Sequence, residues 1–149
     1  MGELINISQG NIITAIHKGE ISLDMPFKKE IYLTNIDVAG VVYCDDIWKI
    51  SETLAIDTKV VLIREPQNHY DKYAIAVYSS DNRKIGYIPR SKNRIFARLM
   101  DAGKYLFGKI IENTPPDFDV LDRPSKEEMN NQRYKYNDFK IRISIFMED

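Results

Sequence analysis

Short runs of β-branched and aromatic residues recur along most of the chain, and no other feature constrains the fold as strongly. Each run has the length of one strand, and the runs cover residues 31–38, 40–43, 59–64, 74–78, 84–88, 105–111 and 141–146. In the last run, Ile141, Ile143 and Ile145 alternate with other side chains, which is the period-two pattern of a half-buried strand. The pattern predicts about six short strands.

Two segments show helical patterns instead. Residues 45–54 predict a short helix capped by Asp45 or Asp46, and residues 91–102 predict a clearer helix capped by Ser91. The apolar face of the second helix comprises Ile95, Phe96, Leu99 and Met100. Strands and helices do not alternate as they do in a parallel sheet. The predicted fold class is therefore mainly β (α+β), a small β-barrel with one or two packed helices.

The chain divides into an N-terminal extension, residues 1–30, and one domain, residues 31–149. A chain of 149 residues buries enough surface to form a core without a metal or a disulfide. Residues 112–137 are polar and contain three prolines, so we expect a long loop there, before the last strand.

Cysteine and histidine are scarce, since Cys44, His17 and His69 are the only ones. One chain therefore cannot form a disulfide or a four-ligand zinc site of the Cys/His kind. No apolar run approaches the roughly 20 residues of a membrane helix, and the first residues lack the basic and apolar regions of a signal peptide. We expect a cytoplasmic protein with no cofactor, no metal and no membrane contact.

Two motifs bear on catalysis, and neither supports it. Residues 103–109 read G-x-x-x-x-G-K, but Ile110 replaces the hydroxyl residue of a phosphate-binding loop, and the segment enters a strand rather than a helix. His69 and Asp71 lie two positions apart, as a base and its orienting acid do, but turn-forming residues have the same composition. A nuclease would need acids or histidines that converge only in space. We expect no enzymatic activity.

The charges are unevenly distributed, although the net charge is only −1. Residues 83–109 hold eight lysines and arginines against one acid, Asp101, which gives +7 there and leaves −8 for the remainder. Such a bias builds a phosphate-binding patch in some proteins and a solvated helix face in others. Charge alone does not separate these alternatives.

The loop at residues 64–72 favours the first alternative. Residues 68–72 bring an amide, an imidazole, a phenol, a carboxylate and an ammonium together, more polar and aromatic groups than a turn needs. Tyr43, Tyr70 and Tyr87 lie at or near strand ends. Aromatic rings beside cations bind single-stranded nucleic acid, although tyrosines with buried bodies and hydrated tips are also common.

Four blocks of sequence carry a more specific pattern. Residues 62–77 read L-I-R-E-P-x-N-x-Y-D-K-x-A-I-x-V, residues 84–89 read K-I-G-Y-I-P, and residues 97–103 read A-R-L-M-D-A-G. Together with V-A-G-V-V-Y at residues 38–43, these blocks resemble the HIRAN domain family, and the resemblance extends from residue 31 to residue 146. It implies an OB-like or SH3-like barrel with a helix packed on it.

The resemblance also implies a DNA site, because helicase-linked members capture the 3′ end of single-stranded DNA in a pocket. It implies that Tyr43 and Tyr70 sandwich the terminal base and that Asp71 accepts a hydrogen bond from the free 3′-hydroxyl. The other implied residues are Asn68 as support for the loop, Tyr87 and Arg90 at the backbone phosphate, and Phe139 against the penultimate base. Lys92, on the basic face of the predicted helix, is a further candidate for DNA binding.

We therefore predict a module that captures single-stranded DNA at a free 3′-hydroxyl end without catalysis of its own. The family context implies a helicase or nuclease as a protein partner. The alternative is a protein-interaction adaptor domain in a DNA-repair or restriction-type system.

Overall fold

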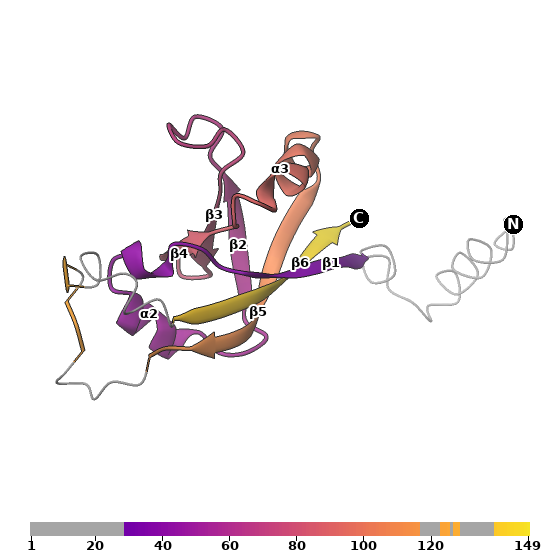
Figure 1. Ribbon diagram of the computed structural model, residues 1–149. Coiled ribbons are helices and arrows are strands. Elements are labelled where there is room, and N and C mark those ends of the chain that lie inside the picture. Colours follow the sequence, from indigo (N-terminus) through magenta and orange to yellow (C-terminus); the bar gives the residue numbers. More distant parts are fainter. Residues whose placement is uncertain (1–28, 117–122, 126, 129–138) are drawn as a thin grey trace, which may run out of the picture.

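Six antiparallel strands form one sheet in the order β1-β6-β5-β2-β3-β4 (Figure 1). The computed structural model describes residues 29–116, 123–125, 127–128 and 139–149. The strands are β1 (Glu30–Asp37), β2 (Lys59–Arg64), β3 (Ile75–Ser79), β4 (Lys84–Tyr87), β5 (Tyr105–Thr114) and β6 (Lys140–Glu148). The helices are the 3-10 turn η1 (Val41–Tyr43), α2 (Ile47–Thr53) and α3 (Asn93–Asp101).

The core follows from the alternation of side chains along the strands. In β6 the predicted pattern is confirmed, because Ile141, Ile143 and Ile145 are each at most 1% exposed. In β2, Val60 and Leu62 are buried, whereas the side chains between them face outward. The apolar side chains on the inner face of the sheet therefore form one continuous core.

The fold class is confirmed as mainly β, with helices α2 and α3 in the described residues, but the sheet does not close into a barrel. Strands β1 and β4 are its two edges, and one isolated bridge between Ala39 and Tyr87 links them through two hydrogen bonds of 2.8 Å. Gly86 permits this approach, because a Cβ atom there would lie 2.4 Å from the carbonyl oxygen of Ala39. The bridge sets the position of the segment that leads into η1.

Three local expectations are wrong. Residues 41–43 form η1 rather than a strand, because Gly40 adopts a left-handed conformation (φ 71°) that turns the chain. Neither helix has a side-chain cap: α2 follows Asp46 and α3 follows Lys92, each without a capping hydrogen bond. Ile95 is 64% exposed, because α3 packs on the sheet through Phe96 and Ala97.

The expected extension and the expected long loop fall mostly outside the described residues. Residues 1–28, 117–122, 126 and 129–138 are not described. β5 continues to Thr114, so the strand includes the first residues assigned to the loop. In the part of the chain that the structure describes, no helix has the length and apolar character needed to cross a membrane.

Candidate nucleic-acid interface

The loop between β2 and β3, residues 65–74, rises beside α3 above the sheet and is held by Asn68 (Figure 1). The Asn68 Oδ1 atom accepts hydrogen bonds from the backbone N–H groups of Tyr70 (2.9 Å) and Asp71 (3.1 Å). Its Nδ2 atom donates to Glu65 Oε1 at 3.0 Å. An asparagine that accepts from the backbone ahead of it stabilises a tight turn. Asn68 therefore fixes the backbone from which Tyr70 and Asp71 project.

Arg64 ties the base of this loop to α3. Its guanidinium donates to both carboxylate oxygens of Asp101, at 2.9 and 3.0 Å. It also donates to the carbonyl oxygens of Ala74 (2.9 Å) and Lys72 (3.1 Å). The Arg64 side chain is only 12% exposed, and a planar fork of this kind is specific to arginine. Arg64 and Asp101 lie in the sequence blocks 62–77 and 97–103, and no sequence pattern predicts that they pair.

Asp71 is anchored from three sides. Its Oδ1 atom accepts the Tyr73 backbone N–H at 2.9 Å, and its Oδ2 atom accepts Asn93 Nδ2 at 2.7 Å and lies 4.0 Å from Arg90 Nε. Burial of the carboxyl group raises its pKa, but these two hydrogen bonds and the charges of Arg90 and Arg64 outweigh burial and lower the pKa overall. Asp71 is therefore an ionised acceptor at neutral pH.

A second network joins the loop to β4. The Tyr87 hydroxyl donates to Glu65 Oε1 at 3.0 Å, and Lys84 Nζ donates to the Tyr87 hydroxyl. Lys84 also lies 3.9 Å from Glu65 Oε2. Burial lowers the pKa of Lys84, but the hydrogen bond to Tyr87 and the charge of Glu65 raise it overall, so the cation is retained. Lys84 and Glu65 were not predicted as site residues.

A cavity of about 730 Å³ lies beside this network, between η1, the start of α2 and β4. Tyr43 and Tyr87 line it, together with Gly40, Cys44, Asp45, Asp46, Lys49, Ile50, Arg83 and Lys84. Tyr43 is 44% exposed at this cavity. Aromatic and cationic side chains thus share one concave surface.

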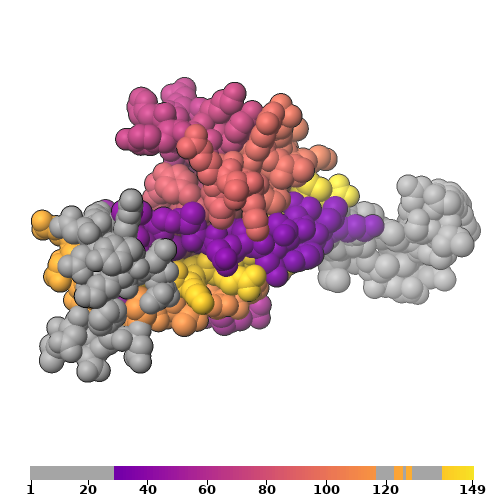
Figure 2. Space-filling view, in the orientation of Figure 1, coloured from indigo at the N-terminus to yellow at the C-terminus, as the bar shows by residue number. Residues whose placement is uncertain are grey.

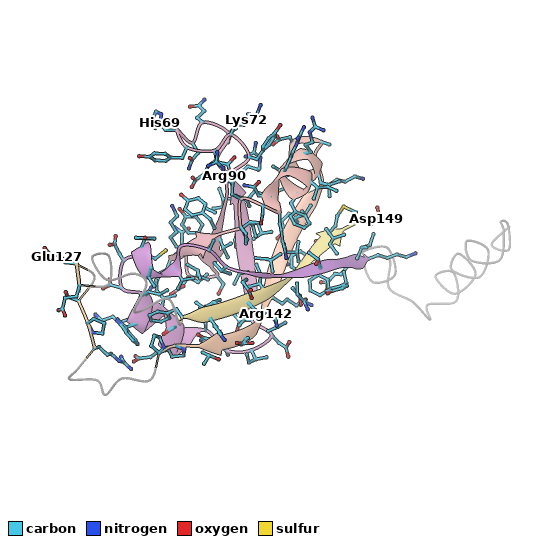
Figure 3. All side chains as sticks on the ribbon, in the orientation of Figure 1. His69, Lys72, Arg90, Glu127, Arg142 and Asp149 are labelled. Atoms are coloured by element: carbon cyan, nitrogen blue, oxygen red, sulfur yellow. The ribbon has the colours of Figure 1, made fainter. Side chains whose placement is uncertain are left out.

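Three of the predicted residues are strongly exposed around the loop. Tyr70 is 86% exposed, the Arg90 side chain is 77% exposed, and Lys92 is exposed at the start of α3. Figure 3 shows Arg90 between the sheet and the loop that carries His69 and Lys72. These side chains form the most accessible part of the candidate site.

The predicted residues thus fall into two adjoining groups and one outlier. Asn68, Tyr70, Asp71, Arg90 and Lys92 belong to the loop region and the adjoining start of α3, and Tyr43 and Tyr87 belong to the cavity. Glu65 connects the groups, because it bonds to both Asn68 and Tyr87. Phe139 lies in the core, 7% exposed and edge-on to Trp48 at 4.7 Å, so its ring is not offered to a base.

The described residues do not bring metal ligands together. Among them, no group of three or more histidine, cysteine or acidic side chains lies close enough to hold a metal ion. Cys44 is buried, and His69 is exposed at the tip of the loop.

Comparison with known proteins gives one family. The model of the HIRAN domain matches residues 31–132, which is more than half of the chain. A search of curated proteins finds no match.

Two solved structures are similar to this chain. A Lactobacillus plantarum protein shares 27% sequence identity with it at a TM-score of 0.63, over 82% of this chain and 98% of that chain. The HIRAN domain of human HLTF shares 17% identity at a TM-score of 0.52, over 80% of this chain and 78% of that chain. At this lower identity, the likeness concerns the fold.

Proposed function

The chain belongs to the HIRAN domain family, whose domains bind DNA, and from this premise we propose that it captures single-stranded DNA at a free 3′-hydroxyl end. In this proposal the chain acts as a binding module and catalyses no reaction itself. A helicase or nuclease would supply the chemistry on the captured strand.

One observation carries the proposal: an ionised carboxylate is held beside a largely exposed aromatic side chain. Asp71 keeps its charge through Asn93, the Tyr73 N–H and Arg90, while Tyr70, the preceding residue, is 86% exposed. Each carboxylate oxygen has capacity for a further hydrogen bond. A 3′-hydroxyl donates such a bond, whereas a 3′-phosphate would set like charges against each other.

The other roles follow the same chemistry. Tyr43 and Tyr70 would stack on the terminal base, since both rings are accessible. Arg90 would meet the adjacent phosphate, and Asn68 would hold the loop in its binding geometry. The Tyr87 hydroxyl would contribute through its link with Lys84, which brings a cation to the same cavity.

Fluorescence anisotropy with two oligonucleotides tests the proposal. They share one sequence and differ in ending with a 3′-hydroxyl or a 3′-phosphate. We expect tighter binding of the hydroxyl end, and equal affinities would exclude end capture. Incubation of labelled DNA with Mg²⁺ or Mn²⁺ tests the absence of catalysis, which strand cleavage would disprove.

A further inference from the structure

A basic groove lies between α3 and β1, where Figure 2 shows the α3 segment resting on the β1 segment. Its volume is about 560 Å³. We call it the α3 groove, and its lining residues are Thr34, Ser91, Lys92, Arg94, Ile95, Phe96 and Arg98. The lining includes three cations and two hydroxyl groups but no carboxylate. The α3 groove is therefore suited to an anion.

In the part of the chain that the structure describes, no carboxylate pairs with the three cations. Among the described residues, Lys92, Arg94 and Arg98 form no ion pair. Elsewhere on the described surface arginines do face carboxylates, as Arg142 faces Asp37 at 2.8 Å. The positive charge in the α3 groove is thus left for a partner outside this part of the chain.

The helix itself gains little from this charge. Lys92 precedes α3 and Arg94 lies in its first turn, where the positive end of the helix dipole disfavours cations. Arg98, in the last turn, is the favourable exception. The acid of α3, Asp101, is held by Arg64 and so does not offset these charges. The helix dipole therefore does not account for Lys92 and Arg94, although the Arg94 guanidinium also lies 5.5 Å from the centre of the Tyr73 ring on the loop.

Ile95 gives the α3 groove a second chemical character. It is 64% exposed although it lies between Arg94 and Arg98 on the same short helix. A free phosphate ion would use the cations alone, whereas a nucleic-acid strand also presents the apolar surface of its sugars and bases. The combination favours a strand over an isolated anion.

The α3 groove adjoins the candidate site. Asn93, the neighbour of Lys92, donates its 2.7 Å hydrogen bond to Asp71, and Arg90 faces the same carboxylate at 4.0 Å. A strand whose end lies at Asp71 would thus have the α3 groove beside it.

We propose that the α3 groove binds the sugar–phosphate backbone of the strand at nucleotides internal to the captured end. This inference rests on the proposed function for the position of the end and adds a second binding surface to it. Arg94 and Arg98 lie one helical turn apart and pair with phosphates, while Ile95 packs against the sugar between them.

Length dependence of binding tests this inference. Oligo(dT) strands of about 3 and about 12 nucleotides, each with a 3′-hydroxyl, are compared by anisotropy with the wild-type protein and with Arg94→Gln/Arg98→Gln. The shorter strand fills the end site alone, so its affinity should not change. Binding of the longer strand should weaken about tenfold, and its salt slope should fall by about 1.4, because two phosphate contacts are lost.

The matched control is Lys59→Gln/Lys140→Gln, which removes two exposed cations outside the α3 groove. It should leave both affinities within about twofold of wild type. Thermal unfolding checks that each variant is folded. Ile95→Gln, which retains all the charges, should also weaken only the longer strand.

The inference would be overturned by wild-type affinity that does not rise with length, or by equal losses in the control pair and the arginine pair. Binding of a labelled polyglutamate peptide as tight as that of the longer strand, abolished by the arginine variants, would also overturn it and would assign the α3 groove to an acidic protein. In another outcome, the shorter strand binds with equal affinity whether it ends in a 3′-hydroxyl or a 3′-phosphate, while Arg94→Gln/Arg98→Gln still weakens binding of the longer strand. That result would refute end capture and support strand binding in the α3 groove.

Discussion

Asn93 Nδ2 donates a 2.7 Å hydrogen bond to Oδ2 of Asp71, which lies 22 positions earlier in the chain. Asn93 is 2% exposed, so this bond is made away from solvent. The first residue of α3 therefore sets the orientation of the carboxylate on the loop. Helix and loop form one unit, although Ile75–Tyr87, which includes two strands, separates them in the sequence.

Replacing Asn93 with alanine should destabilise the protein and loosen the loop. A buried hydrogen bond to a charged acceptor contributes about 1.5–3 kcal/mol, so Asn93→Ala should lower the free energy of unfolding in urea by an amount in that range. The pKa of Asp71 should rise toward its ordinary value of 3.8, as NMR titration would show. Gln67→Ala, on the exposed part of the same loop, is the control. Equal urea curves for the two variants would contradict the role of Asn93.

The lowered pKa of Asp71 makes a prediction about acid stability. Because the folded pKa lies below the ordinary value of 3.8, the carboxylate stabilises the folded state fully above that pH and loses its contribution as the pH falls through the folded pKa. Asp71→Asn should therefore be less stable than wild type near pH 6. The gap in unfolding free energy should narrow near pH 2.5. A gap of the same size at both pH values would show that Asp71 is not the titrating group.

Tyr70 and Asp71 should affect DNA binding in different ways. Tyr70→Ala removes a stacking surface of about 1–3 kcal/mol, so affinity should fall roughly 5- to 150-fold for hydroxyl-ended and phosphate-ended strands alike. Asp71→Asn should mainly reduce the preference for the hydroxyl end. Anisotropy with both ends measures the two effects separately. Identical behaviour of the two variants would refute this division of roles. The control is Tyr105→Ala, which removes an exposed tyrosine outside the candidate site and should leave DNA affinity unchanged.

Local pattern predicted the strands well because side-chain alternation reports directly on burial. The period-two run at residues 141–145 became β6, and the runs at residues 74–78 and 84–88 became β3 and β4. The same pattern failed at residues 41–43, where the left-handed Gly40 redirects the chain into η1. A turn made by one left-handed glycine does not change the pattern of apolar residues around it, so that pattern cannot predict the turn.

The site was predicted less completely, because its partners come from distant segments. The tyrosines and Asp71 belong to recognisable blocks, whereas the contacts of Asn93 and Asp101 with the loop region form only when α3 packs beside it. Helical periodicity placed Ile95 inside, but the packed face of a nine-residue helix is narrow and excludes it. Phe139 was assigned to DNA, but it packs against Trp48 in the core.

The Arg64 fork should be more important for stability than an ordinary surface ion pair. Arg64→Lys retains the charge but cannot reach both oxygens of Asp101 and the carbonyls of Ala74 and Lys72 together. We expect a loss of about 1–2 kcal/mol in unfolding free energy. Solvent reduces the contribution of the ion pair with Asp101, because the Asp101 side chain is half-exposed.

The control for that prediction is Arg142→Lys, because Arg142 also faces an aspartate, Asp37, but on an open surface. It should cost less than about 0.5 kcal/mol. Urea unfolding of both variants measures the difference. If the two losses are equal, the buried fork adds nothing beyond simple charge pairing.

Gly86→Ala should separate the two edges of the sheet. A Cβ atom at Gly86 would lie 2.4 Å from the Ala39 carbonyl oxygen and 2.7 Å from Val38 Cγ1, so the β1 end must move away from β4. We expect a loss of about 1–3 kcal/mol in unfolding free energy and faster hydrogen exchange at the amides of Ala39 and Tyr87. Gly103→Ala is the comparison, because its added Cβ meets no atom within 4 Å and only its backbone (φ 92°) is strained. It should destabilise without altering exchange at Tyr87, whereas unchanged exchange in Gly86→Ala would show that the bridge does not depend on this glycine.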